Sequence, residues 1–296
     1  MVPLITSGYP CFAGEAIRFA DDTGDEVVLS APARRIVSLY AGHTENLEAI
    51  GAGDFIAAVG RDSGSGLPAL GARPGIERII ALSPDLVLTR PMMVRADGAL
   101  YDSLKSFGIA VAAIDPPAWE EFPGYIGRLS AIVGLGDEPE AGAARAMREA
   151  ARIVPDDAPG ALLETNGRIM ATCTPDSWAA HMLAAAGFRN AAAGALPAAP
   201  GSVIGVFGAE RTIASDERID VILLQQGTMN TVTAADFMKD GRFSRMRAVR
   251  NGMVFDVSEE DVSRPSLRRL WNGALISIRE RAEAGGESRW TTAESG

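Results

Sequence analysis

The chain has 296 residues, 47% of them hydrophobic and 22% charged, which is the composition of a folded globular protein and excludes a disordered one. Its formal net charge of −10 has the wrong sign for a protein that binds nucleic acid or an anionic lipid surface. No run of 18 apolar residues is present that would predict a membrane-spanning helix.

The first half of the chain alternates short apolar runs with helical patterns. A turn flanked by β-forming residues at 22–30 predicts a hairpin. Strands are predicted at 35–40, 55–60, 85–89 and 109–114, and helices at 45–50, 76–82 and 100–108, with a loop at 42–44. Strands that alternate with helices indicate an α/β lobe with a mostly parallel sheet.

Two longer helices are predicted next. The first covers 122–136, where Pro123 suits the first turn and Gly136 ends the helix. Pro139 then opens an alanine-rich stretch, 140–154, with few helix breakers. As one helix it would span roughly 24 Å, because each residue adds about 1.5 Å. That length is enough to connect two lobes.

After residue 160 the alternation resumes as a weak copy of the first half. Four landmarks recur at nearly one spacing: Arg35 and Arg168 lie 133 residues apart, Gly51 and Gly187 lie 136 apart, Glu77 and Glu210 lie 133 apart, and Asp85 and Asp220 lie 135 apart. A shared spacing indicates a repeated unit. We therefore predict an N-terminal lobe at 1–138, a connecting helix at 139–157 and a C-terminal lobe at 158–296.

The two cysteines, Cys11 and Cys173, match neither a CxxC metal-binding motif nor the dense spacing of a disulfide-stabilised domain. They either pair with each other in an oxidising compartment or remain two unrelated thiols. The residues before Cys11 do not form a lipid-attachment motif, which disfavours an anchor at that position.

Several stretches together carry a resemblance to a known family. They include Asp22-Thr-Gly-Asp-Glu-Val, Arg35-Ile-Val-Ser-Leu, Ile76-Glu-Arg-Ile-Ile-Ala-Leu-Ser-Pro-Asp-Leu-Val-Leu and Ala248-Val-Arg-Asn-Gly-Met-Val-Phe-Asp-Val. In order and spacing, from Arg18 to Ile278, the chain resembles the substrate-binding proteins of ABC importers for iron–siderophore complexes, haem and vitamin B12. The resemblance implies two Rossmann-like α/β lobes joined by one long helix, with a ligand cleft between them.

The candidate ligand-binding residues follow from the topology of such lobes. In an open α/β sheet, ligands meet the loops at the carboxyl ends of the strands. Those loops contribute Tyr40, His43, Arg61, Arg90 and Met92 in the first lobe, and Trp178, Phe207, Gln225, Gln226 and Arg264 in the second.

The arginines at positions 61, 90 and 264 indicate the charge of the ligand. An acidic chain that places arginines at converging strand ends is suited to bidentate binding of an anion, although each arginine could instead be a solvated rim residue. We therefore predict that the transported ligand is an anionic metal chelate, either a ferric siderophore or a haem-like group. Cobalamin or another corrinoid, and an oxyanion such as molybdate, are the alternatives. No resident cofactor is expected.

The aromatic and histidine candidates leave two interpretations open. His43 or Tyr40 could ligate the metal of the ligand, or they could be a packed histidine and a tyrosine that covers the cleft floor. Trp178 and Met92 could line an apolar wall for a macrocycle, or they could pack ordinarily. His181 lies in an apolar helical stretch and is not a candidate.

Enzyme signatures are missing from the sequence. It contains no GxSxG, P-loop, HExxH or CxxC motif, and its two histidines are too few for the zinc-binding relatives of the family. Residues 64–75 lack a counterpart of the cleft tryptophan of vitamin B12 binders, which puts that ligand in doubt. The distant alternatives are a scaffold or sensor module and a nitrogenase-like metallocluster enzyme, whose cluster cysteines are not matched here.

The resemblance also implies a membrane partner. In this family one glutamate on each lobe docks onto arginines of the ABC permease, and Glu77 and Glu210 occupy matching places in the repeat. The alternative for each is a solvated acidic residue at a helix N-terminus. We expect a monomer in the periplasm or another extracytoplasmic space. Residues 1–8 lack the basic and long apolar regions of a secretory signal, so we expect that the signal has been removed.

Overall fold

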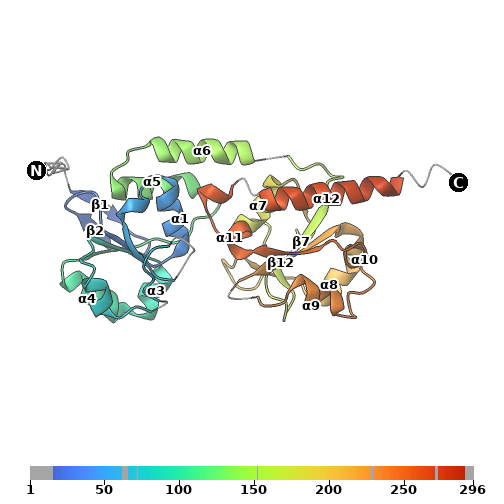
Figure 1. Cartoon of the computed structure of the whole chain (residues 1–296), viewed down its shortest axis with the longest axis horizontal. Coiled ribbons are helices and arrows are strands. Elements are labelled where there is room, and N and C mark those ends of the chain that lie inside the picture. The colour runs from blue at the N-terminus through green and yellow to red at the C-terminus, as the bar shows by residue number, and fades with distance from the viewer. Residues whose placement is uncertain are drawn as a thin grey trace, which may run out of the picture. The chain divides into compact units, whose positions relative to one another are not determined.

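The computed structural model describes residues 16–61, 66–71, 73–151, 153–227, 230–270 and 273–290. The chain divides into two units, each of which mixes helices and strands (Figure 1). Unit 1 comprises Met1–Asp115 and Ile126–Glu140, and unit 2 comprises Pro116–Tyr125 and Ala141–Gly296. The predicted α/β class is confirmed, because each unit contains a four-stranded parallel sheet.

Unit 1 is built on four parallel strands in the order β4-β3-β5-β6. The strands are β3 (Ile36–Ser38), β4 (Ile56–Val59), β5 (Leu86–Thr89) and β6 (Ala110–Ala113). The helices are α1 (Ala41–Ala49), η1 (Gly53–Phe55), α2 (Ile76–Ile80), α3 (Pro91–Ala96), α4 (Gly98–Ser106) and α5 (Phe122–Val133), which begins in unit 2. Every residue of β5 is buried, as expected for a central parallel strand.

The hairpin that the sequence predicts is formed by β1 (Ile17–Ala20) and β2 (Glu26–Leu29), which pair antiparallel. Its turn contains Gly24 at φ +89°, a left-handed conformation that glycine adopts without strain. Asp21 stabilises the turn by accepting a hydrogen bond from the backbone N–H of Thr23 at 2.8 Å.

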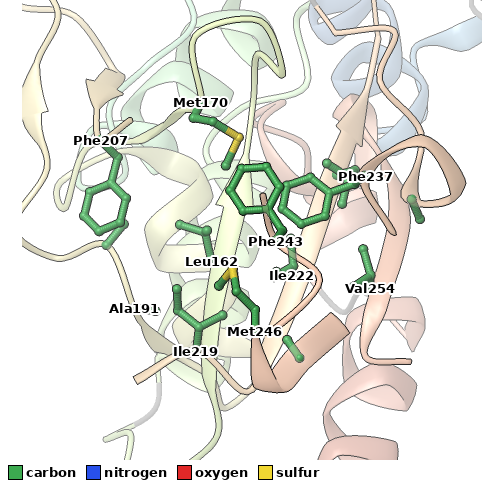
Figure 2. Close-up of a cluster of buried hydrophobic side chains, with 14 of the residues drawn as sticks. Leu162, Met170, Ala191, Phe207, Ile219, Ile222, Phe237, Phe243, Met246 and Val254 are labelled. Atoms are coloured by element: carbon green, nitrogen blue, oxygen red, sulfur yellow. The ribbon is translucent and has the colours of Figure 1, made fainter. Parts of the chain in front are cut away.

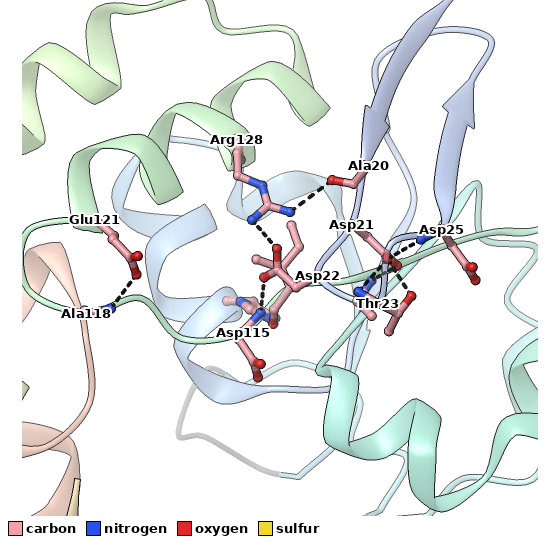
Figure 3. Close-up of polar contacts among 12 residues, drawn as sticks. Ala20, Asp21, Asp22, Thr23, Asp25, Asp115, Ala118, Glu121 and Arg128 are labelled. Carbon is pink, nitrogen blue, oxygen red and sulfur yellow. Dashed lines mark hydrogen bonds and ion pairs between the residues drawn. The ribbon is translucent and has the colours of Figure 1, made fainter. Parts of the chain in front are cut away.

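The same turn holds the carboxyl end of β6. Asp21 accepts a hydrogen bond from the backbone N–H of Ala113 at 3.0 Å, and Asp22 accepts one from the backbone N–H of Asp115 at 2.7 Å. Arg128 of α5 pairs with the Asp22 carboxylate at 2.7 Å (Figure 3). The hairpin therefore fixes the residues that follow β6, one of which belongs to the candidate site.

Unit 2 contains a second parallel sheet in the order β13-β12-β7-β9 and a small antiparallel sheet in the order β10-β11-β8. The strands are β7 (Gly160–Glu164), β8 (Ala171–Cys173), β9 (Arg189–Asn190), β10 (Leu196–Pro197), β11 (Ile204–Val206), β12 (Val221–Gln226) and β13 (Val254–Ser258). The helices are α6 (Glu138–Ala150), α7 (Trp178–Ala185), α8 (Ala209–Ala214), η2 (Asp216–Arg218), α9 (Ala234–Lys239), α10 (Arg247–Arg250), α11 (Glu259–Val262), η3 (Leu267–Arg269) and α12 (Gly273–Trp290).

Both faces of the second parallel sheet are buried. Successive residues of β12 alternate between two hydrophobic clusters: Val221 and Leu223 pack on one face, and Ile222 and Leu224 on the other. The latter cluster includes Phe237 and Phe243, whose rings stack at 4.4 Å between centroids (Figure 2). Burial on both faces explains why the strand has no alternating polar residues.

The two parallel sheets have the same topology, and this corrects one landmark of the predicted repeat. In each sheet the first strand along the chain lies between the second and the third, so β3 corresponds to β7 and β5 to β12. Arg168 was predicted to match Arg35, but it precedes β8 of the small antiparallel sheet, so that pairing is wrong. The true counterpart, β7, is a short apolar run whose strand character periodicity does not reveal.

Asp85 and Asp220, which the repeat predicts to be equivalent, each accept a hydrogen bond from the backbone at the start of the first strand of their sheet. Asp85 accepts a hydrogen bond from the backbone N–H of Arg35 at 3.0 Å, at the start of β3. Asp220 accepts one from the backbone N–H of Gly160 at 2.9 Å, at the start of β7, and pairs with Arg247 at 2.7 Å. A Cβ atom at position 160 would overlap the carbonyl oxygen of Arg218, so this close approach requires glycine.

Replacing Asp220 by alanine is expected to lower the free energy of unfolding by about 2 kcal/mol, because a buried backbone N–H loses a charged acceptor. Asp220→Asn keeps an oxygen acceptor and loses only the ion pair with Arg247, so we expect it to cost about 1 kcal/mol or less. Urea unfolding of both variants measures the difference. Equal losses in the two variants would show that the backbone contact contributes nothing.

The chain enters unit 2 for the second time within α6, between Glu140 and Ala141. This helix covers Glu138–Ala150, so it begins two residues before the predicted stretch 140–154 and ends four residues before its end. Among the residues that the structure describes, no helix is both long and apolar enough to cross a membrane. Cys11 lies outside the described residues, so its pairing with Cys173 stays a prediction, and the Cys173 side chain is buried.

Candidate functional site

Three of the predicted ligand-binding residues meet at the carboxyl edge of the unit 1 sheet. Tyr40 follows β3 and precedes the first turn of α1, while Arg90 follows β5 and precedes α3. The Arg90 guanidinium carbon lies 5.0 Å from the centroid of the Tyr40 ring, a cation–π geometry. The Tyr40 and His43 rings in turn form a T-shaped pair, with centroids 4.9 Å apart and planes at 80°.

Arg90 also has a carboxylate partner in its own unit. Its Nε lies 3.7 Å from Oδ1 of Asp115, which follows β6 and donates its backbone N–H to Asp22. This ion pair is long and only partly buried, so its strength is modest. A bidentate anion that reaches the guanidinium could replace or share the pair.

His43 is fully buried in the first turn of α1. Its Nε2 lies 3.2 Å from the carbonyl oxygen of Thr89 and 3.0 Å from that of Ile114. Burial lowers the pKa of the imidazole to about 4, so the ring is neutral at neutral pH. The helix begins four residues before the predicted 45–50, which turns the expected loop around His43 into helix.

The other two unit 1 candidates are exposed. Arg61 follows β4 and faces solvent, and the Met92 side chain in α3 is 50% exposed. A nearby cavity of about 70 Å³, lined in part by Leu39 and Tyr101, lies beside α3 and α4. It is far smaller than the roughly 300–1,000 Å³ of small-molecule pockets. This cavity is therefore not a site for a metal chelate.

In unit 2 the two candidate glutamines lie at the carboxyl end of β12. The Gln225 side-chain oxygen accepts a hydrogen bond from the Ser263 hydroxyl. The Gln226 amide donates to the carbonyl oxygen of Val232 at 2.8 Å and to Asp256 at 3.0 Å. Gln226 therefore also helps to hold the loop that follows its own strand.

Trp178 and Phe207 are both packed among other side chains, with 6% of each residue exposed. The Trp178 ring lies 4.8 Å from that of Trp119 and 4.8 Å from that of Phe122. Phe207 belongs to the hydrophobic cluster of Figure 2, and the Arg211 guanidinium carbon lies 4.8 Å above its ring. Their contact with a ligand stays a prediction.

Arg264, the third predicted anion-binding arginine, is paired within unit 2. Its guanidinium lies 3.3 Å from the Glu260 carboxylate, and its side chain is 14% exposed. Of the three arginines, Arg90 and Arg264 thus have acidic neighbours, whereas Arg61 is the exposed one. The charge available to a ligand at these positions is smaller than the sequence alone suggests.

Sequence reasoning missed a buried carboxyl group at the carboxyl end of β7. Glu164 is 1% exposed, and its Oε2 accepts a hydrogen bond from the Asn230 amide at 2.7 Å. Burial raises the pKa of Glu164 to about 7, although the bond from Asn230 acts in the opposite direction. Its only signal in the sequence is one acidic residue at the end of an apolar run.

Glu164 is also linked to the loop after β12. The Asn230 side-chain oxygen accepts hydrogen bonds from the backbone N–H groups of Gly167 at 3.2 Å and Val232 at 3.1 Å. One amide therefore joins the end of β7 to two segments of backbone. Within the described part of the chain, no group of three or more His, Cys, Asp and Glu side chains could hold a metal ion.

The chain matches the model of a known protein family. The family model described as "Periplasmic binding protein" matches residues 67–260, which is more than half of the chain. A comparison with curated proteins found no match.

Solved structures share the fold at low sequence identity. The periplasmic haem-binding protein RhuT from Roseiflexus sp. RS-1 is 22% identical, with a TM-score of 0.63 over 86% of this chain and 99% of that chain. The periplasmic vitamin B12-binding protein BtuF of Vibrio cholerae is 18% identical, with a TM-score of 0.59 over 85% and 98%. An ABC-type Fe3+-hydroxamate transport system from Saccharomonospora viridis DSM 43017 is 19% identical, with a TM-score of 0.60 over 91% and 98%.

Proposed function

Because the chain belongs to the periplasmic binding protein family, we propose that it captures an anionic metal chelate outside the cytoplasm and delivers it to the permease of an ABC importer. The chelate is a ferric siderophore or a haem-like group, and the protein performs no chemistry on it. Structural neighbours named for haem and Fe3+-hydroxamate support this ligand class, and one named for vitamin B12 supports the corrinoid alternative. The fold alone does not select among them.

The observation that carries the anionic assignment is the arrangement around Arg90. Its guanidinium lies over the Tyr40 ring at the carboxyl edge of the unit 1 sheet, and its acidic partner Asp115 is 3.7 Å away. The exposed Arg61 follows β4, which runs parallel to its neighbour β3, so Arg61 lies at the same edge of the sheet. An aromatic face beside guanidinium groups suits a chelate that carries carboxylates.

Calorimetry with a ferric siderophore, haemin, cobalamin and molybdate tests the proposal. We expect tight binding of one of the first two, and a loss of about 10- to 100-fold in affinity for Arg90→Ala or Arg61→Ala, because each removes a charge-assisted hydrogen bond. Arg95→Ala, which removes the same charge one turn into α3, is the matched control and should bind as wild type does.

Two results would contradict the proposal of an anionic metal chelate. One is tight binding of cobalamin alone with no effect of Arg61→Ala and Arg90→Ala, which would establish a neutral corrinoid ligand. The other is binding of molybdate alone, which would keep the charge and exclude the chelate. An ultraviolet–visible spectrum of the purified protein gives an independent check through a Soret, corrinoid or charge-transfer band.

The partner proposal concerns Glu77 and Glu210. Both are exposed, and each lies in the first turn of a short helix, α2 and α8, that precedes equivalent strands β5 and β12. These equivalent positions support docking of one carboxylate per lobe onto basic residues of the permease. Such charge pairs orient a complex and accelerate its formation.

A further inference from the structure

His43 lies where two strands of unit 1 end, although it belongs to neither. Its Nε2 is within hydrogen-bond distance of two carbonyl oxygens, those of Thr89, the last residue of β5, and of Ile114, the first residue after β6. Carbonyl oxygens can only accept, so Nε2 must carry the proton and donate. A nitrogen that donates in this way has no lone pair with which to ligate a metal.

The two carbonyl groups belong to the peptide planes that lead into Arg90 and Asp115. A peptide group is rigid and planar, so fixing its oxygen also fixes the nitrogen of the next residue. The peptide between Ile114 and Asp115 is held on both sides: His43 lies on its oxygen, and Asp22 accepts its N–H at 2.7 Å. The peptide that precedes Arg90 is tied to the same histidine.

The side chains of Arg90 and Asp115, which follow these peptides, contact each other, and Arg90 also contacts Tyr40. Arg90 and Asp115 pair at 3.7 Å, the Arg90 guanidinium carbon lies 5.0 Å from the Tyr40 ring centroid, and that ring meets His43 edge-on. A Cβ atom at Gly42 would overlap the Tyr40 ring, so glycine at this position lets the ring lie against α1. Arg90 and Asp22 are the charged groups that act on the imidazole.

From these contacts we infer that His43 is a positioning residue, which fixes Arg90 and Asp115 by donating one shared hydrogen bond to the peptides that precede them. Its Nε2 is therefore not available to ligate a metal. The importance of this arrangement for ligand capture rests on the proposed function of Arg90. The positioning itself is a property of the ligand-free protein, so it can be tested without a ligand.

The first test is the tautomer of His43 in the wild-type protein. Nitrogen-15 NMR at pH 7 is expected to show a neutral ring with the proton on Nε2. A ring with the proton on Nδ1 and a bare Nε2 would overturn the inference, because the imidazole could not then donate to the two carbonyl groups. This measurement needs no variant, so a variant that fails to fold does not remove it.

The second test measures solvent exchange of the Arg90 side-chain N–H, whose Nε is buried. In His43→Leu we expect this exchange to become about tenfold faster, because the carbonyl oxygen of the peptide before Arg90 loses the shared bond and is left with the one from the backbone N–H of Ile114. In His43→Gln, whose amide can still donate, exchange should stay within about threefold of wild type. Leu47→Ala, a buried position one turn further along α1, controls for general destabilisation.

The outcomes separate positioning from ordinary packing. Faster exchange in His43→Leu, with rescue in His43→Gln and little change in Leu47→Ala, supports the inference. Equal acceleration in His43→Leu and Leu47→Ala, or no acceleration in His43→Leu, overturns it. Failure of the wild-type protein to bind any of the four ligand probes would instead count against the proposed function and would leave these NMR results standing.

Discussion

Replacing both Glu77 and Glu210 by arginine is expected to abolish transport and ligand-stimulated ATPase activity with the reconstituted cognate permease. Each substitution turns a carboxylate that would attract a basic residue of the permease into a cation that repels it, and like charges across an interface cost several kcal/mol. Both side chains are exposed, so the folded protein should tolerate the change. Ligand affinity of the isolated protein should stay within about twofold, because rim charges mainly alter association with their own partner.

A matched control carries the same change in net charge elsewhere. Asp102 in α4 and Glu149 in α6 are also exposed, and arginine at both positions should leave transport intact. Transport that survives reversal at Glu77 and Glu210 would show that docking uses another surface. Equal loss in the control would show that overall charge, and not these two carboxylates, governs the encounter with the permease.

The pH dependence of stability is expected to change markedly when Glu164 is replaced by glutamine. The pKa of this buried carboxyl is about 7, against an ordinary value of 4.5. A raised pKa means that its favourable contribution is complete below pH 4.5 and is lost as the pH rises through 7. The loss amounts to about 3 kcal/mol, at about 1.4 kcal/mol for each pH unit. Glu164→Gln cannot ionise, and its oxygen can still accept from Asn230.

Urea unfolding at pH 4.5, 6 and 8 measures this effect as a difference between variant and wild type, in which other titrating groups cancel. The variant should gain stability relative to wild type as the pH rises, by up to about 3 kcal/mol at pH 8. In Asn230→Ala the Glu164 carboxylate loses the donor that lowers its pKa, so that pKa should rise further. The drop in the free energy of unfolding between pH 4.5 and pH 8 should then be larger than in wild type. A difference that does not vary with pH would contradict a buried, titrating Glu164.

The fold class, the family resemblance and most of the element order follow from the amino-acid sequence alone. Alternation of apolar runs with helical patterns is a local property, so the hairpin, the four strands of unit 1 and the equivalence of Asp85 and Asp220 could be predicted. The predicted site could name residues at strand ends for the same reason: parallel strands place their carboxyl ends along one edge.

The equivalence of the strands and the contacts of each side chain, in contrast, depend on how the chain folds in space. β7 is a short, fully buried run, and burial on both faces removes the alternation that identifies a strand in a sequence. Arg90 pairs with Asp115, which lies 25 residues further along the chain. His43 contacts the carbonyl groups of Thr89 and Ile114, which lie 46 and 71 residues further along. The pKa of Glu164 likewise depends on its burial and on Asn230, 66 residues away. Hydrogen bonds and desolvation act over a few ångströms in space, so a pattern read along the chain cannot report them.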